Sequence, residues 1–309
     1  MIFTDQPLYT IYNYLKDLLQ KSNVNDVIEF EVIDPDISNE FSGTKISILG
    51  NKYIYRPFKV WVDLAEVLHC KILTPRAAGN NHILIRYTPL NISKSWHNHS
   101  GVSITEKYGA GSDFAKIFKF EEPYFLNDYL RALSEIPVKE GMNILNLGIN
   151  RGDEFKIIKE VFSEIYETFT FTGIDHCRSA LKIAEGSFPQ ENFTFINDDI
   201  SNVGNLKLKK QDLIISIGTL QSPDIDGHEV FRCLIQNVIS RDGSVILGFP
   251  NSRYIDCEVV YGAKTKNYSE SNLNLLFKDI SFYKKYLQQH GYKAITFGKY
   301  YVFLVAVKD

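Results

Sequence analysis

The stretch ILNLGINRGDEFKII, residues 144–158, decides the fold of this 309-residue chain. It opens with a short apolar run typical of a buried strand and ends with the apolar spacing of a helix. Gly148 and Gly152 lie between the two. Glycine permits a sharp turn there and lets a ligand approach the backbone N–H groups at the helix N-terminus. The stretch therefore predicts a strand, a ligand-binding glycine turn and a helix.

Short β-branched runs alternate with amphipathic stretches from about residue 137 onward, which is typical of βαβ units around a parallel sheet. The predicted strands cover residues 142–148, 169–175, 192–198, 212–218 and 243–249, and the predicted helices cover about 152–165, 178–187, 226–240 and 277–290. The last two apolar runs, YKAITFG and YYVFLVAV, are separated only by Lys299. They must be antiparallel, because a parallel pair needs a crossover of about a dozen residues. We expect an α/β fold: a Rossmann-like, doubly wound sheet with a C-terminal antiparallel hairpin.

The first part of the sequence has a different pattern. Helical spacing of apolar residues predicts a helix over 9–21, and three runs read as strands: 27–33, 44–50 and 82–88. The Ser-, Asn- and Gly-rich stretch 91–113 is the best candidate for a linker. We therefore expect an N-terminal α+β domain over residues 1–112 that helps to choose the substrate, and a second domain over 113–309.

The composition is that of an ordinary globular protein. There are 34 Lys and Arg against 37 Asp and Glu, a formal net charge of −3, and 44% of the residues are hydrophobic. This excludes a disordered chain and a disulfide-rich miniprotein, and it lacks the cationic excess of dedicated nucleic-acid binders. The four cysteines form no C-x-x-C pair, so we expect no metal site and a reducing compartment.

Membrane insertion and secretion are not expected either. No apolar run is long enough to span a bilayer, and Asp5 stands where a signal peptide would carry basic residues. The sequence therefore predicts a cytoplasmic protein with no membrane partner.

Acidic residues follow the next two predicted strands. Asp175 ends the second strand, where a carboxylate can accept hydrogen bonds from both hydroxyls of a ribose, and Asp198 and Asp199 follow the third. Ligands of open α/β sheets bind outside the carboxyl ends of the strands, where the strand order reverses. The glycine turn and these carboxylates converge on that place.

With these motifs, residues from about 137 to 309 resemble the class I S-adenosylmethionine (SAM)-dependent methyltransferases. In that family a glycine loop follows a hydrophobic strand, the second strand ends in an acidic residue, and the sheet finishes in a reversed hairpin. The resemblance implies SAM as the cofactor. It also implies which residues contact it: Gly148 and Gly152 the methionine part, Asp175 the ribose, Asp199 or Asp198 the adenine amino group, and Ile200 the adenine ring.

Two asparagines depart from the family pattern. Asn146 stands where the family usually has an acidic residue, which leaves open the contact to the amino group of SAM, and Asn150 replaces a third glycine. Asparagine tolerates the left-handed conformation better than most residues, so Asn150 need not spoil the turn. The other expected cofactor-site residues lie at the ends of the second and fourth strands: His176, Ser216 and Gly218.

Residues for the methyl acceptor are expected in two segments. The insertion 248–272 begins at the end of the fifth strand and contains Arg253 and Tyr254. Arg253 is the preferred anion contact, because its fork binds two oxygens at once. In the other segment, 91–113, His97 and His99 are candidates for a general base.

Methyl transfer from a sulfonium is an in-line displacement that requires alignment and, for some acceptors, removal of a proton. We expect transfer to oxygen or nitrogen, because Cys177 lies on the ribose side and Cys257 follows the fifth strand by several residues, so neither suits carbon methylation. An RNA nucleotide and a small polar metabolite both remain open as acceptors. The extra domain and the 248–272 insertion favour RNA, whereas the net charge of −3 favours the metabolite.

Two other classes of function compete with this interpretation. A nicotinamide-dependent oxidoreductase is expected to contain the fuller G-x-G-x-x-G turn and usually has no reversed hairpin. A non-catalytic binding protein on the same fold is the other, since Asn146 and Asn150 depart from the family pattern. The sequence does not predict the oligomeric state.

Overall fold

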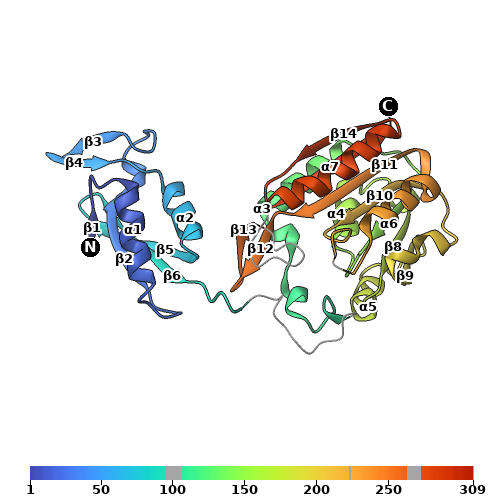
Figure 1. The fold of residues 1–309 in the computed structure, drawn as a ribbon, viewed down its shortest axis with the longest axis horizontal. Coiled ribbons are helices and arrows are strands. Elements are labelled where there is room, and N and C mark those ends of the chain that lie inside the picture. The colour runs from blue at the N-terminus through green and yellow to red at the C-terminus, as the bar shows by residue number, and fades with distance from the viewer. Residues whose placement is uncertain (95–105, 223, 263–272, 309) are drawn as a thin grey trace. The chain divides into compact units, whose positions relative to one another are not determined.

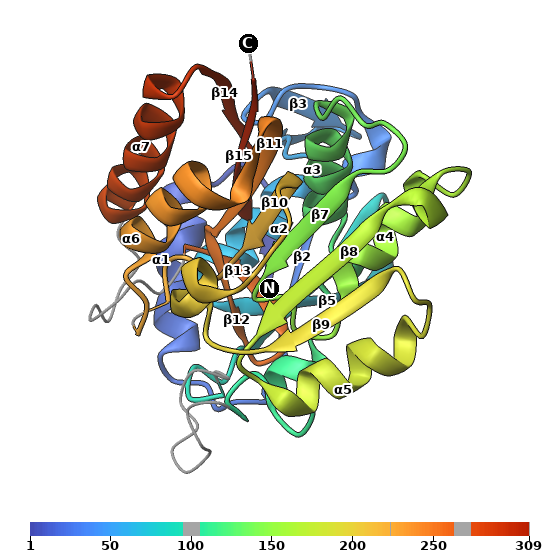
Figure 2. The same ribbon diagram turned by 90° about the vertical axis from the view of Figure 1, so that its right-hand side faces the viewer.

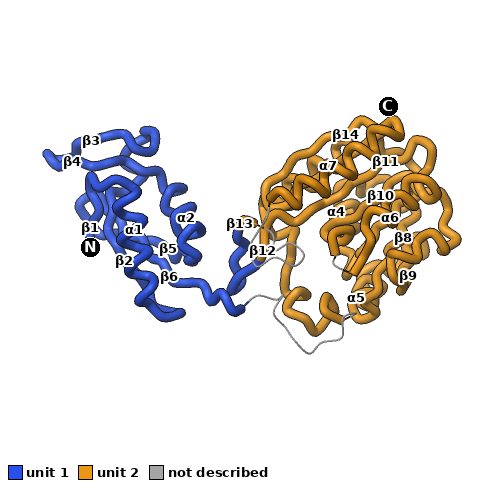
Figure 3. The backbone as a smooth tube through the Cα atoms, viewed as in Figure 1, with its two compact units in different colours: residues 1–98, 254–260 blue, residues 99–253, 261–309 orange. Residues whose placement is uncertain are grey.

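The computed structural model describes residues 1–94, 106–222, 224–262 and 273–308. The chain forms two compact units (Figure 3): unit 1 comprises Met1–Asn98 and Tyr254–Val260, and unit 2 comprises His99–Arg253 and Tyr261–Asp309. The chain therefore passes from one unit to the other three times. The first passage comes before the predicted boundary at 112/113, and the return of a short segment to unit 1 has no counterpart in the predicted domains.

Unit 2 is built on a seven-stranded sheet in the order β14-β15-β11-β10-β7-β8-β9 (Figures 1 and 2). Its strands are β7 (Asn143–Leu147), β8 (Thr170–Asp175), β9 (Phe193–Asn197), β10 (Gln211–Ile217), β11 (Ile239–Pro250), β14 (Tyr292–Phe297) and β15 (Tyr301–Lys308). The first five are parallel to one another, and β15 is antiparallel to both β11 and β14. The predicted doubly wound α/β fold with a terminal antiparallel hairpin is confirmed.

Helices cover both faces of this sheet, as Figure 2 shows. One face packs against α3 (Pro123–Ser134), α4 (Asp153–Val161) and α5 (Arg178–Ser187). The other packs against α6 (Gly227–Cys233), the π-helical turn Leu234–Val238 and α7 (Leu273–Gln289). The predicted helix 226–240 ends early, because β11 already begins at Ile239.

Apolar side chains of the strands alternate between the two faces and fill a core on each. On the first face Phe155 of α4 packs on Phe171 of β8, with ring centroids 4.9 Å apart. On the second, Phe231 of α6 meets Tyr283 of α7 edge to face at 4.9 Å. Each fully buried aromatic or Leu side chain stabilises the fold by about 1.5–3 kcal/mol, so the edge that carries the glycine turn rests on a rigid base.

Unit 1 contains a four-stranded sheet in the order β1-β2-β6-β5. Its elements are β1 (Ile2–Phe3), α1 (Leu8–Leu19), β2 (Ile28–Ile33), β3 (Lys45–Ile48), β4 (Asn51–Ile54), α2 (Phe58–Val67), β5 (Cys70–Gly79) and β6 (His82–Pro89). Phe30, Trp61 and Tyr87 form its centre, and the Tyr87 hydroxyl donates to the Trp61 carbonyl at 2.6 Å. The predicted helix 9–21 and the strands 27–33, 44–50 and 82–88 are present, whereas β1, β4, β5 and α2 were not predicted.

The hairpin of β12 (Ser252–Ile255) and β13 (Glu258–Tyr261) supplies the segment that returns to unit 1. Ile255 and Val260 bury their side chains with Leu90. At the tip, Asp256 Oδ2 accepts a hydrogen bond from the Asn91 N–H at 3.1 Å. The tip of the predicted acceptor-binding insertion is therefore part of the packing of unit 1.

Within the described ranges, none of the helices combines the length and the hydropathy that crossing a membrane requires.

Candidate functional site

The glycine turn between β7 and α4 uses three left-handed residues. The φ angles are +71° at Gly148, +51° at Asn150 and +90° at Gly152. A Cβ on Gly148 would overlap the Thr219 side chain, and one on Gly152 would lie 2.6 Å from Cε2 of Phe188. The two glycines are required for conformation and for space, and the prediction that Asn150 tolerates its place in the turn is confirmed.

Asp175, at the carboxyl end of β8, is bonded directly to this turn. Its side chain is 6% exposed. Oδ2 accepts from the Asn150 N–H and Oδ1 from the Cys177 N–H, each at 2.8 Å. Burial raises the pKa of Asp175, and the two backbone hydrogen bonds oppose that rise. Since a carboxylate offers about four lone-pair sites, two remain for further donors such as ribose hydroxyls.

The end of β9 is tied to the end of β8 by an amide. Asn197 Nδ2 donates to the carbonyls of Asp175 and His176, at 3.0 Å each. The Nε2 atom of His176 is buried and has no hydrogen-bond partner among the described residues. His176 Nε2 is therefore available to a ligand at this edge, and the role of His176 in the cofactor site stays a prediction.

The residues after β9 are engaged in their own turn. Asp198 Oδ1 accepts from the Asp199 N–H at 2.7 Å, and Asp199 Oδ1 accepts from the Ser201 N–H at 2.8 Å at the start of the 3₁₀ helix Ile200–Asn205. Ile200 is buried in the core beneath the sheet edge. The contacts expected of these three residues with adenine stay predictions.

Two buried polar side chains lie near the carboxyl ends of β7 and β10. Asn146 is 1% exposed and Ser216 is 2% exposed. Asn146 Nδ2 and Ser216 Oγ have no hydrogen-bond partner among the described residues. An unsatisfied buried donor costs about 1–3 kcal/mol, so such atoms point to a ligand or water that completes the site.

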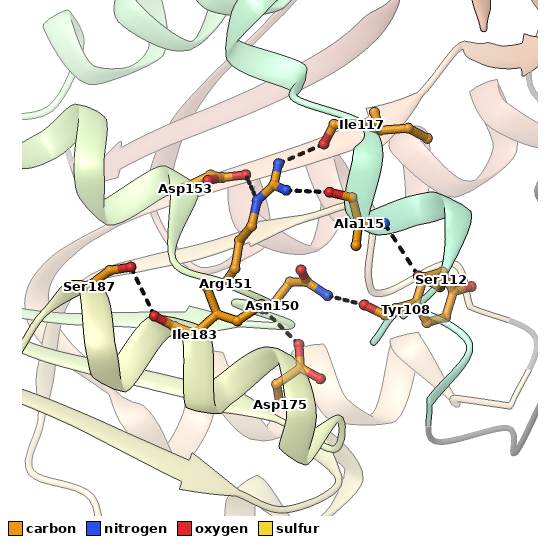
Figure 4. A network of polar contacts seen from close by, with 10 residues as sticks. All are labelled: Tyr108, Ser112, Ala115, Ile117, Asn150, Arg151, Asp153, Asp175, Ile183 and Ser187. Atoms are coloured by element: carbon orange, nitrogen blue, oxygen red, sulfur yellow. Dashed lines mark hydrogen bonds and ion pairs between the residues drawn. The ribbon is translucent and has the colours of Figure 1, made fainter. Parts of the chain in front are cut away.

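Two side chains of the glycine turn hold the segment that precedes α3 (Figure 4). Asn150 Nδ2 donates to the Tyr108 carbonyl at 2.8 Å. The Arg151 guanidinium donates to the carbonyls of Ala115 and Ile117, both at 2.7 Å. We call residues 106–121 the strap; it contains the 3₁₀ helices Asp113–Lys116 and Lys119–Glu121. Three hydrogen bonds thus join the turn to the strap across sequence separations of 34, 36 and 42 residues.

Glu106 brings the strap to the other side of Asp175. Its carboxylate accepts from the Ser179 hydroxyl and, at 3.5 Å, from the Cys177 thiol. The hydrogen bond from Ser179 is the main cause of a lowered pKa for Glu106. Sequence reasoning missed Glu106 because it lies in a polar stretch with no periodic pattern.

A second missed group lies at the end of β10. Gly218 has a φ of +73°, and a Cβ there would lie 3.7 Å from the Tyr301 hydroxyl and 3.8 Å from Lys119 Nζ. Tyr301 begins β15, and Lys119 belongs to the strap. Neither residue carries a local motif, so only the folded chain shows that both face the edge where Gly218 was predicted to act.

The acceptor candidates fall in three places. Arg253 Nη1 donates to the carbonyls of Tyr261 and Gly262, at 3.0 and 2.5 Å, and so closes its own hairpin. Tyr254 belongs by its contacts to unit 1. His97 and His99 lie outside the described residues. All four roles stay predictions.

Comparisons with known proteins find likeness in structure alone. No family model and no curated protein matches the sequence. A chain from the complex of the Haloferax volcanii Trm112 methyltransferase activator is 12% identical, with 67% of this chain and 99% of that chain covered and a TM-score of 0.46. A SAM-dependent methyltransferase from Aquifex aeolicus is 16% identical, with coverages of 64% and 99% and a TM-score of 0.44.

A third solved structure holds a reaction product. The N-methyltransferase NodS from Bradyrhizobium japonicum, in complex with S-adenosylhomocysteine (SAH), is 12% identical, with 62% of this chain and 91% of that chain covered and a TM-score of 0.42. At such identities the likeness concerns the fold, which the strand order of unit 2 defines by itself.

Proposed function

We propose that this protein is a SAM-dependent methyltransferase. One observation carries the proposal: the turn of Gly148, Asn150 and Gly152 is held against the buried carboxylate of Asp175 by a 2.8 Å hydrogen bond. The turn follows β7, and the strand order reverses between β7 and its neighbour β10. This is the place at which open α/β sheets bind ligands with a ribose, close to a helix N-terminus.

The residues of the site fit a nucleoside that carries an amino-acid tail. Asp175 has lone pairs left for a ribose diol. Gly148 leaves no room for a Cβ beside Thr219, and the unpartnered Asn146 and Ser216 offer polar atoms beneath the same edge. When bound there, SAM supplies an electrophilic methyl group. The chain's own residues hold the two reactants in line and exclude water.

The acceptor that we propose is an oxygen or a nitrogen, on an RNA nucleotide or on a small polar metabolite. Methylation at C5 of cytosine would need an available cysteine thiolate. Burial raises the pKa of the Cys177 thiol, which is also bonded to Glu106, and Cys257 lies in the tip that packs with unit 1. Neither cysteine is placed as a nucleophile at the end of β10 or β11.

The strap brings charged groups to the same edge as the glycine turn. Its contacts with Asn150, Arg151 and Ser179 hold Lys119 and Glu106 there.

Incubation with methyl-labelled SAM tests the proposal. Total cell RNA and a metabolite extract are each treated with wild type and with Asp175→Ala, and mass shifts are recorded. We expect a shift of one methyl group in one of the two pools with wild type and none with the variant. Labelled SAM that binds without transfer to either pool would favour a non-catalytic binding protein, and absence of binding would leave the nicotinamide-dependent oxidoreductase as the competing enzyme.

A further inference from the structure

The ammonium group of Lys119 lies near three aromatic rings beside the sheet edge. Its Nζ lies 5.3 Å from the ring centroid of Tyr301, 5.7 Å from that of Phe114 and 5.9 Å from that of Phe125. Burial lowers the pKa of Lys119, but Tyr301 and Glu154 more than offset this and hold it above the ordinary value. The ammonium therefore stays charged at neutral pH.

The ammonium and a phenol meet at the end of β10. Lys119 Nζ and the Tyr301 hydroxyl lie 3.8 and 3.7 Å from the position that a Cβ would take on Gly218. An ammonium only donates hydrogen bonds, and a phenol hydroxyl can donate one. An oxygen placed near that position can therefore accept from both side chains.

The carboxylates near Lys119 do not supply a full counter-charge. Burial raises the pKa of Glu154 to about 7, so its carboxyl group is a weaker counter-charge than an ordinary glutamate. Asp153 pairs with Arg151 at 2.7 Å. A desolvated ammonium with so little negative charge around it is stabilised by any anion that reaches it.

An independent observation indicates that a ligand reaches this edge. Asn146 lies opposite Ile215 in the register of β7 and β10, so its side chain points to the sheet face on which the Ile215 core and Tyr301 pack. Its Nδ2 atom is buried without a partner among the described residues. The buried amide of Asn146 and the donor groups of Lys119 and Tyr301 therefore lie on the same side of the sheet.

We propose that Lys119 and Tyr301 form an anion subsite that binds a single carboxylate at the end of β10. The proposal rests on the proposed function, because two reactants of a methyl transfer can bring such a group. One is the methionine part of the cofactor, which ends in a carboxylate. The other is an acceptor whose anionic oxygen lies beside the atom to be methylated.

Calorimetry with two nucleosides distinguishes these sources. SAH carries the amino-acid tail, whereas 5′-methylthioadenosine has the same sulfur and ribose without it. If the cofactor supplies the carboxylate, Lys119→Met weakens SAH binding by about 10- to 100-fold and leaves methylthioadenosine binding unchanged. Tyr301→Phe, which keeps the ring, gives a smaller change in the same direction. Lys116→Met, an exposed lysine of the same strap that pairs with Asp113, is the matched control.

If the acceptor supplies it, the variants bind SAH as wild type does. Acetate titrated into SAH-saturated protein then binds to wild type and to Lys116→Met, but not to Lys119→Met or Tyr301→Phe. Wild-type affinity for SAH, methylthioadenosine and acetate in both folded variants would overturn the subsite. Failure of wild type to bind SAH at all would instead count against the proposed function.

Discussion

The two halves of the carboxyl edge of unit 2 are built in opposite ways. At β7 and β8, the turn and the carboxylate come from neighbouring stretches of the chain and are joined by backbone N–H groups. At β10 and β15, Lys119, Gly218 and Tyr301 come from three distant segments, and the side chains of Lys119 and Tyr301 lie beside the Gly218 backbone. The first half can be recognised in the sequence, because its backbone geometry requires glycines and an acidic residue at a strand end. The second half cannot, because its charged and polar residues form no local motif.

The largest effect is expected where backbone geometry decides. Gly148→Ala forces a side chain into a left-handed residue and into Thr219, at a combined cost of about 3–4 kcal/mol, so SAH binding should be lost. Gly141→Ala is the matched control, because φ there is +75° but the space for a Cβ is open. Calorimetry and thermal unfolding of both variants check this. Equal SAH affinity in the two would show that the turn does not contact the ligand.

The next largest effect is expected at Glu154, which lies near Lys119 in the charged half of the edge. Glu154 has a folded pKa of about 7, above the ordinary value, so the folded chain binds this proton more tightly than the unfolded chain. Its contribution to stability is present below about pH 4 and is lost as pH rises through 7, by about 3 kcal/mol. Urea unfolding of wild type and Glu154→Gln between pH 4.5 and 8 should show wild type losing stability relative to the variant.

Glu160→Gln, a change of the same kind at an exposed position of α4, is the control for that series. Parallel pH curves for wild type and Glu154→Gln would mean that Glu154 is ionised in the folded protein at all these values.

A smaller loss is expected at the strand-end acid. Asp175→Ala should weaken SAH binding by about 2 kcal/mol, because a buried diol loses charge-assisted hydrogen bonds. Asp212→Ala is matched to it: Asp212 accepts from the Asn143 N–H at 2.9 Å, near the start of β10 at the opposite edge of the sheet. Calorimetry should find SAH affinity reduced in Asp175→Ala and unchanged in Asp212→Ala. The opposite result would show that Asp175 is not part of the site.

The smallest effect concerns the connection between the halves. Arg151→Lys keeps the charge but loses the fork that reaches the carbonyls of Ala115 and Ile117. We expect about 1 kcal/mol of local destabilisation. Hydrogen exchange should speed up in the strap and stay unchanged in β11. Unchanged exchange at residues 113–118 would show that the strap holds its place without Arg151.

The same contrast explains what the sequence could predict. The sheet of unit 2 was predictable because its strands are apolar runs between helical stretches, and the reversed hairpin followed from the single residue Lys299 between two such runs. In unit 1, β5 was missed because CKILTPRAAG contains a proline, an arginine and small residues, and its pairing with β6 shifts register between Leu73 and Arg76. Irregular pairing erases the alternation on which a strand prediction depends.

The site divides in the same way. Gly148, Asn150 and Asp175 are joined as their positions suggested, since strand ends of neighbouring parallel strands meet at one edge. The β12–β13 hairpin did not follow, because its packing with Leu90 and its bond to Asn91 depend on residues about 160 positions away in the chain. Packing between residues so far apart in the chain produces no local periodic pattern from which it could be predicted.

The most direct test of the account is a calorimetric titration of the wild-type protein with SAH and, separately, with NAD⁺. The glycine turn, Asp175 and the subsite at β10 together predict one SAH bound per chain and no heat from NAD⁺. A folded protein that gives no heat with SAH, or that binds NAD⁺ in its place, would contradict the assignment of this edge to a SAM-dependent methyltransferase.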